Sequence, residues 1–208
     1  MRQISLPFDR PIHAGSQAKA DEFLVSDANR IAVRHLENWR NWPLAVSVLS
    51  GPPLSGRSTL GRHFAAQSGG TVIDDAQRQD ERTLFNAWND AQTAQRPLLL
   101  IADAPPEQWQ VALPDLRSRL AAAPHVALEE PDEALARALI ERSLSSAGAS
   151  YAADLPEWLL RRIERSYAAI AAATRLLDEA ALSSGRKIST AMAKHVLQGA
   201  GFLPIVPD

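Results

Sequence analysis

A glycine-rich loop between a short apolar run and a helical segment most constrains what this chain can fold into. Residues 51–58 read GPPLSGRS, which fits the pattern G-x-x-x-x-G-K-[ST] except that Arg57 stands at the lysine position. Such a loop wraps a phosphate group with successive backbone N–H groups at the N-terminus of the next helix. The apolar run 44–49 precedes the loop, and a helix is expected from Ser58 to about Gln67. The pattern predicts a phosphate-binding α/β fold.

The loop supplies most of the candidate nucleotide contacts. The glycines permit close approach of a phosphate, and the hydroxyl of Ser58 is the type of ligand expected on Mg²⁺. Arg57 keeps the positive charge of lysine, but its side chain is longer and planar, so the exchange is not conservative. The candidate loop residues are Gly51, Pro52, Ser55, Gly56, Arg57, Ser58 and Thr59.

Acidic residues at the ends of two later strands complete the candidate site. Residues 72–75 read VIDD, and we expect Asp74 to share the metal with Ser58 and Asp75 to act as a base or to position water. Asp103 directly follows the strand 98–102 and is a candidate polar sensor. In the alternative interpretation, the strand only precedes a helix capped by Asp75 or Asp80. The 17-residue step from Arg57 to Asp74 leaves room for one helix and no intervening strand.

The order of elements predicts two domains after an N-terminal arm. Strands at 44–49, 72–73, 98–102 and 126–128 alternate with helices, which indicates a parallel sheet. The first helix is expected to be capped by Ser26 or Asp27 and to bury Ile31, His35, Leu36 and Trp39. After Pro131 only helices are expected, at 132–147, 156–166, 167–183 and 189–198, with Leu135, Ala138 and Leu139 on one face of the first. The expected boundaries are 1–20 for the arm, 21–130 for the α/β domain and 131–208 for the helical domain.

Composition excludes several classes of protein. The 22 basic and 24 acidic residues give a formal net charge of −2, so the chain is no obvious electrostatic nucleic-acid binder. The lack of cysteine excludes a disulfide- or zinc-stapled miniprotein. The chain has no apolar run of about 18 residues and no signal-like N-terminus, so we expect a cytoplasmic protein without membrane contact.

Motifs along nearly the whole length resemble the AAA+ domain of the bacterial replication initiator DnaA, and more closely the short Hda-type homologues of DnaA. They are the segment 23–42, the phosphate loop, IDDAQ at 73–77, LLLIADAPP at 98–106 and LPDLRSRL at 113–120. The resemblance implies a P-loop AAA+ three-layer parallel sheet, here shortened, followed by a small all-helical lid. It also implies ADP or ATP with Mg²⁺ as ligands, and Arg119 as an arginine finger toward a partner's nucleotide.

The N-terminal arm carries a second resemblance. Residues 3–8, QISLPF, are similar to the pattern by which Hda-type proteins dock on the sliding clamp, the beta subunit of the DNA polymerase. The implied clamp-binding residues are Gln3, Ser5, Leu6, Pro7 and Phe8. An extended arm of this kind can place apolar side chains in a pocket while proline limits the entropy lost on ordering. A frayed terminus with stray apolar residues is the alternative.

The resemblance implies a negative regulator of replication initiation that binds the clamp and promotes hydrolysis of ATP bound to DnaA. DNA would then be contacted only indirectly, and pairing of two copies stays open. Three features predict that the chain is not an efficient ATPase itself. They are Arg57, the shortened loop-to-strand spacing and Ile101, where relatives often have Thr. The alternatives are a self-assembling P-loop ATPase and a nucleotide-free, DnaA-like protein-binding module.

Overall fold

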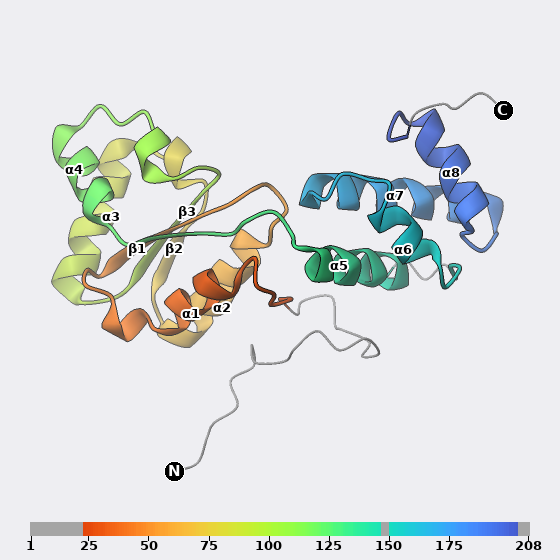
Figure 1. Cartoon of the computed structure of the whole chain (residues 1–208). Helices are drawn as coiled ribbons and strands as arrows, with labels where there is room; N and C mark the ends of the chain where they lie inside the picture. The colour runs from red at the N-terminus through yellow and green to blue at the C-terminus, as the bar shows by residue number, and fades with distance from the viewer. Residues whose placement is uncertain (1–22, 147–149, 204–208) are drawn as a thin grey trace, which may run out of the picture. The chain divides into compact units, whose positions relative to one another are not determined.

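The computed structural model describes residues 23–146 and 150–203, which form two compact units. The first unit spans Asp27–Glu129 and contains the sheet, and the second contains the described residues from Glu130 onward. Figure 1 shows the sheet and its helices in the first unit and only helices in the second. Among the described residues, no helix combines the length and apolar character that crossing a membrane requires.

A four-stranded parallel sheet forms the centre of the first unit. The strands are β1 (Val46–Ser50), β2 (Thr71–Ile73), β3 (Leu98–Ala102) and β4 (His125–Ala127), in the order β2-β3-β1-β4. Every residue of β1 and β3 is buried, which explains their continuous apolar character. The expected strands are confirmed, although β1 starts two residues later and β4 one residue earlier than expected. These shifts are within the usual uncertainty of strand ends.

Helices cover both faces of the sheet and give the expected three layers. α1 (Arg30–Glu37) and α2 (Arg57–Ser68) lie on one face, and α3 (Glu81–Ala94) and α4 (Pro114–Ala122) lie on the other (Figure 1). Short 3₁₀ turns follow α1 at Trp39–Asn41, β2 at Ala76–Arg78 and β3 at Pro106–Gln108. The core between the sheet and α3–α4 contains Val46, Val48, Leu84, Trp88, Leu98, Leu100, Leu116 and Leu120.

The expected buried face of the first helix was wrong. Leu36 is buried as expected, but Ile31 is 76% exposed, and Ala32 and Val33 are buried in its place. Neither Ser26 nor Asp27 caps it, because helical backbone starts only at Arg30. Trp39 lies in a separate 3₁₀ turn after the eight-residue helix ends. The spacing rule assumed one longer helix through Trp39, whereas the buried residues of α1 recur at Ala32, Val33 and Leu36.

The acidic strand lies at an edge of the sheet. β2 pairs only with β3 among the described strands, with Thr71 opposite Leu98 and Ile73 opposite Leu100. α2 leads directly into β2, as the short spacing in the sequence predicts. Gly69 ends α2 in the left-handed conformation, with φ of 68°, so that the chain can turn back along the sheet.

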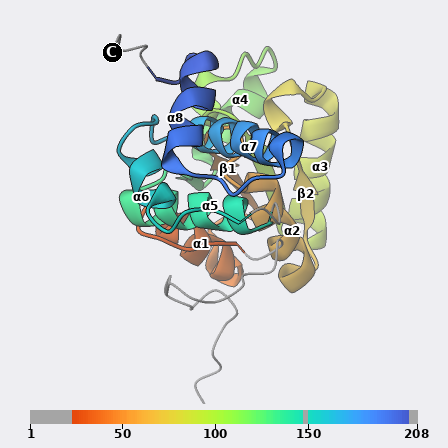
Figure 2. The ribbon, with the colours of Figure 1, turned by 90° about the vertical axis from the view of Figure 1, so that its right-hand side faces the viewer.

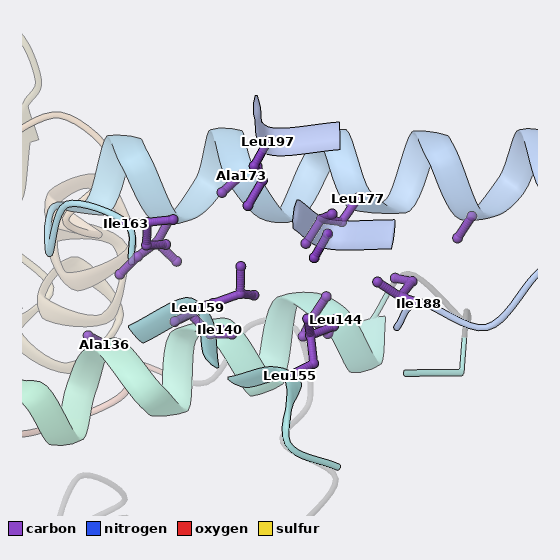
Figure 3. Close-up of a cluster of buried hydrophobic side chains, with 13 residues drawn as sticks. Ala136, Ile140, Leu144, Leu155, Leu159, Ile163, Ala173, Leu177, Ile188 and Leu197 are labelled. Carbon is purple, nitrogen blue, oxygen red and sulfur yellow. The ribbon is translucent and has the colours of Figure 1, made fainter. Parts of the chain in front are cut away.

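The second unit is an assembly of four helices. They are α5 (Glu133–Ser146), α6 (Leu155–Leu160), α7 (Tyr167–Ser184) and α8 (Thr190–Gly199), and α7 contacts both α5 and α8 (Figure 2). Their buried side chains form one apolar core, shown in Figure 3, which includes Ile140, Leu144, Leu155, Leu159, Leu177 and Leu197. The hydroxyl of Ser189 accepts a hydrogen bond from Met192 N and caps α8.

Two details of this unit differ from expectation. The buried face of α5 contains Leu135, Ala136, Ile140 and Leu144, whereas Ala138 and Leu139 are only partly buried. α6 ends at Leu160 rather than near residue 166, because the chain turns before Ser166 caps α7. The expected fold class, a parallel α/β sheet followed by an all-helical part, is confirmed.

Candidate functional site

The loop from β1 to α2 forms a turn that exposes the N-terminus of α2. Leu54 and Gly56 both have left-handed backbone, with φ of 65° and 89°. Gly56 is the N-cap residue, and no side chain of the described residues caps the helix. The first N–H groups of a helix have no partner within it, and the helix dipole favours negative charge there. The loop therefore suits an anion such as a phosphate group.

Ser55 provides an independent indication of a ligand. Its side chain is 5% exposed, and its Oγ has no hydrogen-bond partner among the described residues. A buried hydroxyl without a partner is costly, so a ligand oxygen would relieve a real deficit. Gly51 keeps the loop close to Leu128, since a Cβ at Gly51 would lie 2.9 Å from the Leu128 Cβ. The backbone and Ser55 thus fit a phosphate group.

Two further loop residues, Pro52 and Thr59, make local contacts. The carbonyl of Pro52 accepts a hydrogen bond from Ser55 N over 3.3 Å, which closes the turn. The hydroxyl of Thr59 accepts one from Arg62 Nη2 over 3.2 Å on the exposed side of α2. Neither contact blocks the N-terminus of α2.

Arg57 is directed to the end of β3. Its Nη2 lies 2.6 Å from Asp103 Oδ1, and its Nη1 donates to the carbonyl oxygen of Ala102. The side chain is only 12% exposed. The charge that a lysine would supply to a bound phosphate is therefore paired with a carboxylate of the same chain. A bidentate guanidinium suits this contact better than an ammonium does.

Asp103 also joins a third segment to this site. Its Oδ2 accepts hydrogen bonds from Gln77 Nε2 at 3.0 Å and from Arg78 Nη2 at 3.1 Å. Arg78 was not among the candidates, and Gln77 was noted only as part of a motif. Both lie in the 3₁₀ turn that follows the acidic pair, and left-handed Asp75, with φ of 49°, starts this turn. A left-handed aspartate is hard to predict from sequence, so the turn was missed.

The proposed metal ligands contact each other. Ser58 Oγ donates to Asp74 Oδ2 over 2.5 Å, and Asp74 Oδ1 accepts from Asp75 N over 3.0 Å. No group of three histidine, aspartate or glutamate side chains is placed to hold a metal ion in 23–146 or 150–203. Mg²⁺ usually takes one or two protein oxygens and completes its shell with phosphate oxygens and water. Ser58 and Asp74 fit that role beside a bound phosphate.

Two serines of β1, the strand that precedes the loop, are each paired with a histidine of another element. His35 Nε2 and Ser47 Oγ are 2.7 Å apart, and His125 Nε2 and Ser50 Oγ are also 2.7 Å apart. Burial lowers the pKa of both imidazoles, and the neighbouring His125 lowers the pKa of His35 further. Both histidines are therefore favoured in the neutral form. Trp42 stacks on the His35 ring, with centroids 5.0 Å apart, so this network is part of the packing.

Arg119 lies on α4, away from the loop, and is held by several groups. Its Nη1 donates to Asn89 Oδ1 over 2.6 Å, and its Nη2 pairs with Asp115 Oδ2 at 3.1 Å. Its Cζ lies 4.5 Å from the centre of the Phe85 ring. The side chain is 30% exposed. Arg117 instead donates to the carbonyl of Val111, so the two arginines have different surroundings.

The candidate clamp-binding residues lie outside the described part of the chain. These are Gln3, Ser5, Leu6, Pro7 and Phe8.

No protein-family model matches this chain. Similarity appears among solved structures. Domain III of the replication initiation protein DnaA from Thermotoga maritima aligns with a TM-score of 0.73 and 14% identity, covering 88% of this chain and 95% of that one. AMPPCP-bound DnaA from Aquifex aeolicus aligns with a TM-score of 0.59 and 16% identity, covering 76% of this chain and 63% of that chain, so less than two thirds of it is matched.

A motor of another kind has a similar fold. The RuvB Holliday junction branch migration motor of Thermotoga maritima aligns with a TM-score of 0.64 and 19% identity, covering 86% of this chain and 71% of that one. At identities below 20%, these alignments establish the fold. The chain therefore has the α/β fold with C-terminal helices of the AAA+ domain III of DnaA, and shares it at a distance with RuvB.

Proposed function

We propose that this chain is an adaptor that promotes hydrolysis of ATP bound to a DnaA-type initiator and so limits replication initiation. In this proposal Arg119 is the arginine finger, which places its guanidinium against the partner's nucleotide. A cation there stabilises the charge that develops on the transferred phosphoryl group. The proposal makes the chain a catalyst only in combination with its partner.

The observation that carries the proposal is the partly exposed Arg119 on a DnaA-like AAA+ fold. The Arg119 side chain is 30% exposed, on a helix of the outer layer. The fold likeness to DnaA domain III supports a partner with the same fold, because domains of one fold can pair through equivalent faces. The LPDLRSRL segment that contains Arg119 supports the same reading.

The contacts of Arg57 support a regulatory rather than a self-hydrolysing role. Its charge is paired with Asp103, so the loop lacks the side-chain cation that usually binds the terminal phosphates. A nucleotide held by the backbone and by Ser55 would be bound without efficient turnover. We propose ADP as this nucleotide, because the paired Arg57 does not supply a cation to a third phosphate. The proposal disfavours a self-assembling P-loop ATPase. Asp75→Asn should then leave ATP turnover by the purified chain unchanged, because the wild type has no efficient turnover of its own.

The test is the turnover of DnaA-bound ATP in the presence of clamp loaded on DNA. Arg119→Ala should lower the stimulation by at least about 100-fold, whereas capture by the clamp should be unchanged. Arg82→Ala, which removes an exposed arginine of α3, is the matched control and should stimulate normally. Full stimulation by Arg119→Ala would refute the finger assignment.

We also propose that the arm binds the sliding clamp. The QISLPF pattern supports this proposal, and a pull-down on immobilised clamp tests it. The triple variant Gln3→Ala/Leu6→Ala/Phe8→Ala should lose capture, and thermal unfolding checks that the variant is still folded. Unchanged capture would remove the arm from the proposal.

A nucleotide-free protein-binding module is the second candidate. The Arg57–Asp103 ion pair favours it, because the charge of the loop arginine is already paired within the chain. Titration calorimetry with ADP and with ATP separates the two candidates. Saturation at micromolar ligand would exclude the nucleotide-free module, and no heat change at millimolar ligand would support it.

A further inference from the structure

We infer that Phe85 and Asn89 of α3 are positioning residues for Arg119, and that they hold its guanidinium ready for the partner's nucleotide. The inference rests on the proposed function of Arg119. It adds α3 as a second helix that takes part in this function, beside α4, which carries Arg119. Neither residue carries a charge of its own or would touch the nucleotide, so both act through Arg119.

The two residues hold different parts of the guanidinium. The ring of Phe85 lies under its face, with Cζ 4.5 Å from the ring centre, and Asn89 Oδ1 accepts from Nη1 over 2.6 Å. With the ion pair to Asp115, these contacts engage two of the five N–H donors of the arginine. The remaining donors stay available to phosphate oxygens. The guanidinium is thus held at one face and one edge, while its other N–H donors can bind a ligand.

A third residue of α3 fixes the start of the helix that carries Arg119. The two carboxylate oxygens of Glu81 accept hydrogen bonds from the backbone N–H groups of Ala112 and Leu113, over 2.6 and 2.8 Å. Glu81, Phe85 and Asn89 follow one another at intervals of four residues, so they form one stripe along α3. This stripe contacts the chain from the residues before α4 to the tip of the Arg119 side chain.

The energetic reason for such a stripe is preorganisation. A free arginine has many rotamers, and ordering it in the transition state costs conformational entropy. Contacts that order the side chain beforehand remove this cost from the reaction. Misplacement of a catalytic group by about 1 Å can lower a rate by about 100-fold. The loss of one of these three holding contacts should therefore cost on the order of 10-fold in rate.

The experiment measures single-turnover hydrolysis of DnaA-bound ATP at saturating adaptor, together with adaptor binding to DnaA. Asn89→Ala and Phe85→Leu should each lower the rate by about 10-fold and leave the affinity for DnaA within about twofold. Phe85→Trp keeps an aromatic face and should restore the rate to near that of the wild type. Asn86→Ala removes an exposed asparagine from another face of α3 and should change neither quantity.

A second measurement does not depend on the partner. The ¹⁵N order parameter of the Arg119 Nε–H group should be high in the free protein and should fall below about 0.6 in Asn89→Ala. Unchanged order in both Asn89→Ala and Phe85→Leu would overturn the inference. Full stimulation by both variants, with Arg119→Ala inactive, would also overturn it and leave the proposed function intact. Full stimulation by Arg119→Ala would refute the proposed function itself.

Discussion

Arg57 and Asp103 form an ion pair, with Nη2 2.6 Å from Oδ1, that joins the first residue of α2 to the residue after β3. The arginine that replaces a phosphate-binding lysine therefore also links helix α2 to the end of strand β3. The pair lies at the position where the loop, β3 and the turn after β2 meet.

Arg57→Ala should destabilise the folded protein by about 1–3 kcal/mol, because a largely buried charged hydrogen bond is lost and Asp103 keeps only its weaker partners. Urea unfolding measures this change. In a double-mutant cycle with Asp103→Ala, the coupling energy should be about 0.5–3 kcal/mol. Arg82→Ala should stay within about 0.5 kcal/mol of the wild type. A coupling near zero would contradict this link between α2 and β3.

Ser55→Ala should have opposite effects on the free and the bound protein. Removing a buried hydroxyl without a partner should stabilise the free protein by about 1 kcal/mol. The same change removes a hydrogen bond to a bound phosphate, so the Kd for ADP should rise about 10-fold. Thermal unfolding and calorimetry give the two values. An unchanged Kd would show that the hydroxyl does not face the ligand.

Gly61→Ala should destabilise the protein although alanine is the better helix former. A Cβ at this position of α2 would lie 2.6 Å from the Cδ1 of Ile101 and 3.2 Å from the Cγ1 of Val72. The resulting overpacking should cost about 1–3 kcal/mol in the free energy of unfolding. Gly199→Ala in α8 meets nothing within 4 Å and should instead be neutral or stabilising by up to about 1 kcal/mol. Equal effects at both positions would contradict the close packing of α2.

The stability contributed by His35 should depend on pH. Its pKa is lowered in the folded protein, so the unfolded chain binds the proton more tightly. The contribution is therefore complete above about pH 6.5 and is lost as the pH falls through the lower folded pKa. The difference in unfolding free energy between the wild type and His35→Gln should shrink from pH 7.5 to pH 5.5. A difference that stays constant over this range would be inconsistent with burial of the imidazole.

The sequence was most informative where burial or a local loop pattern determined the type of element. The strands β1 and β3 are apolar throughout because both of their faces are covered, and the loop pattern requires a strand before it and a helix after it. Side-chain direction could not be predicted in the same way. Arg57 was assigned to phosphate by position, whereas its contact with Asp103 depends on how β3 ends beside α2.

Long-range contacts also account for the other omissions. Phe85 and Asn89 lie on an amphipathic helix whose sequence does not indicate that α4 packs beside it. The exposure of Ile31 depends on which face of α1 packs against the rest of its unit, and no side chain of the described residues caps the start of this helix. Each omission concerns the geometry between elements rather than the type of element.

The placement of β2 has a consequence for how the sheet opens. This strand has three residues, is only partly buried and pairs with β3 alone among the described strands, whereas β1 lies between two neighbours. Its backbone amides should exchange with solvent faster than those of β1, so the aspartates that follow it lie at a weakly protected edge of the sheet. The brevity of this strand also leaves little unpaired backbone on which a foreign strand could add, which protects the protein from edge-to-edge aggregation.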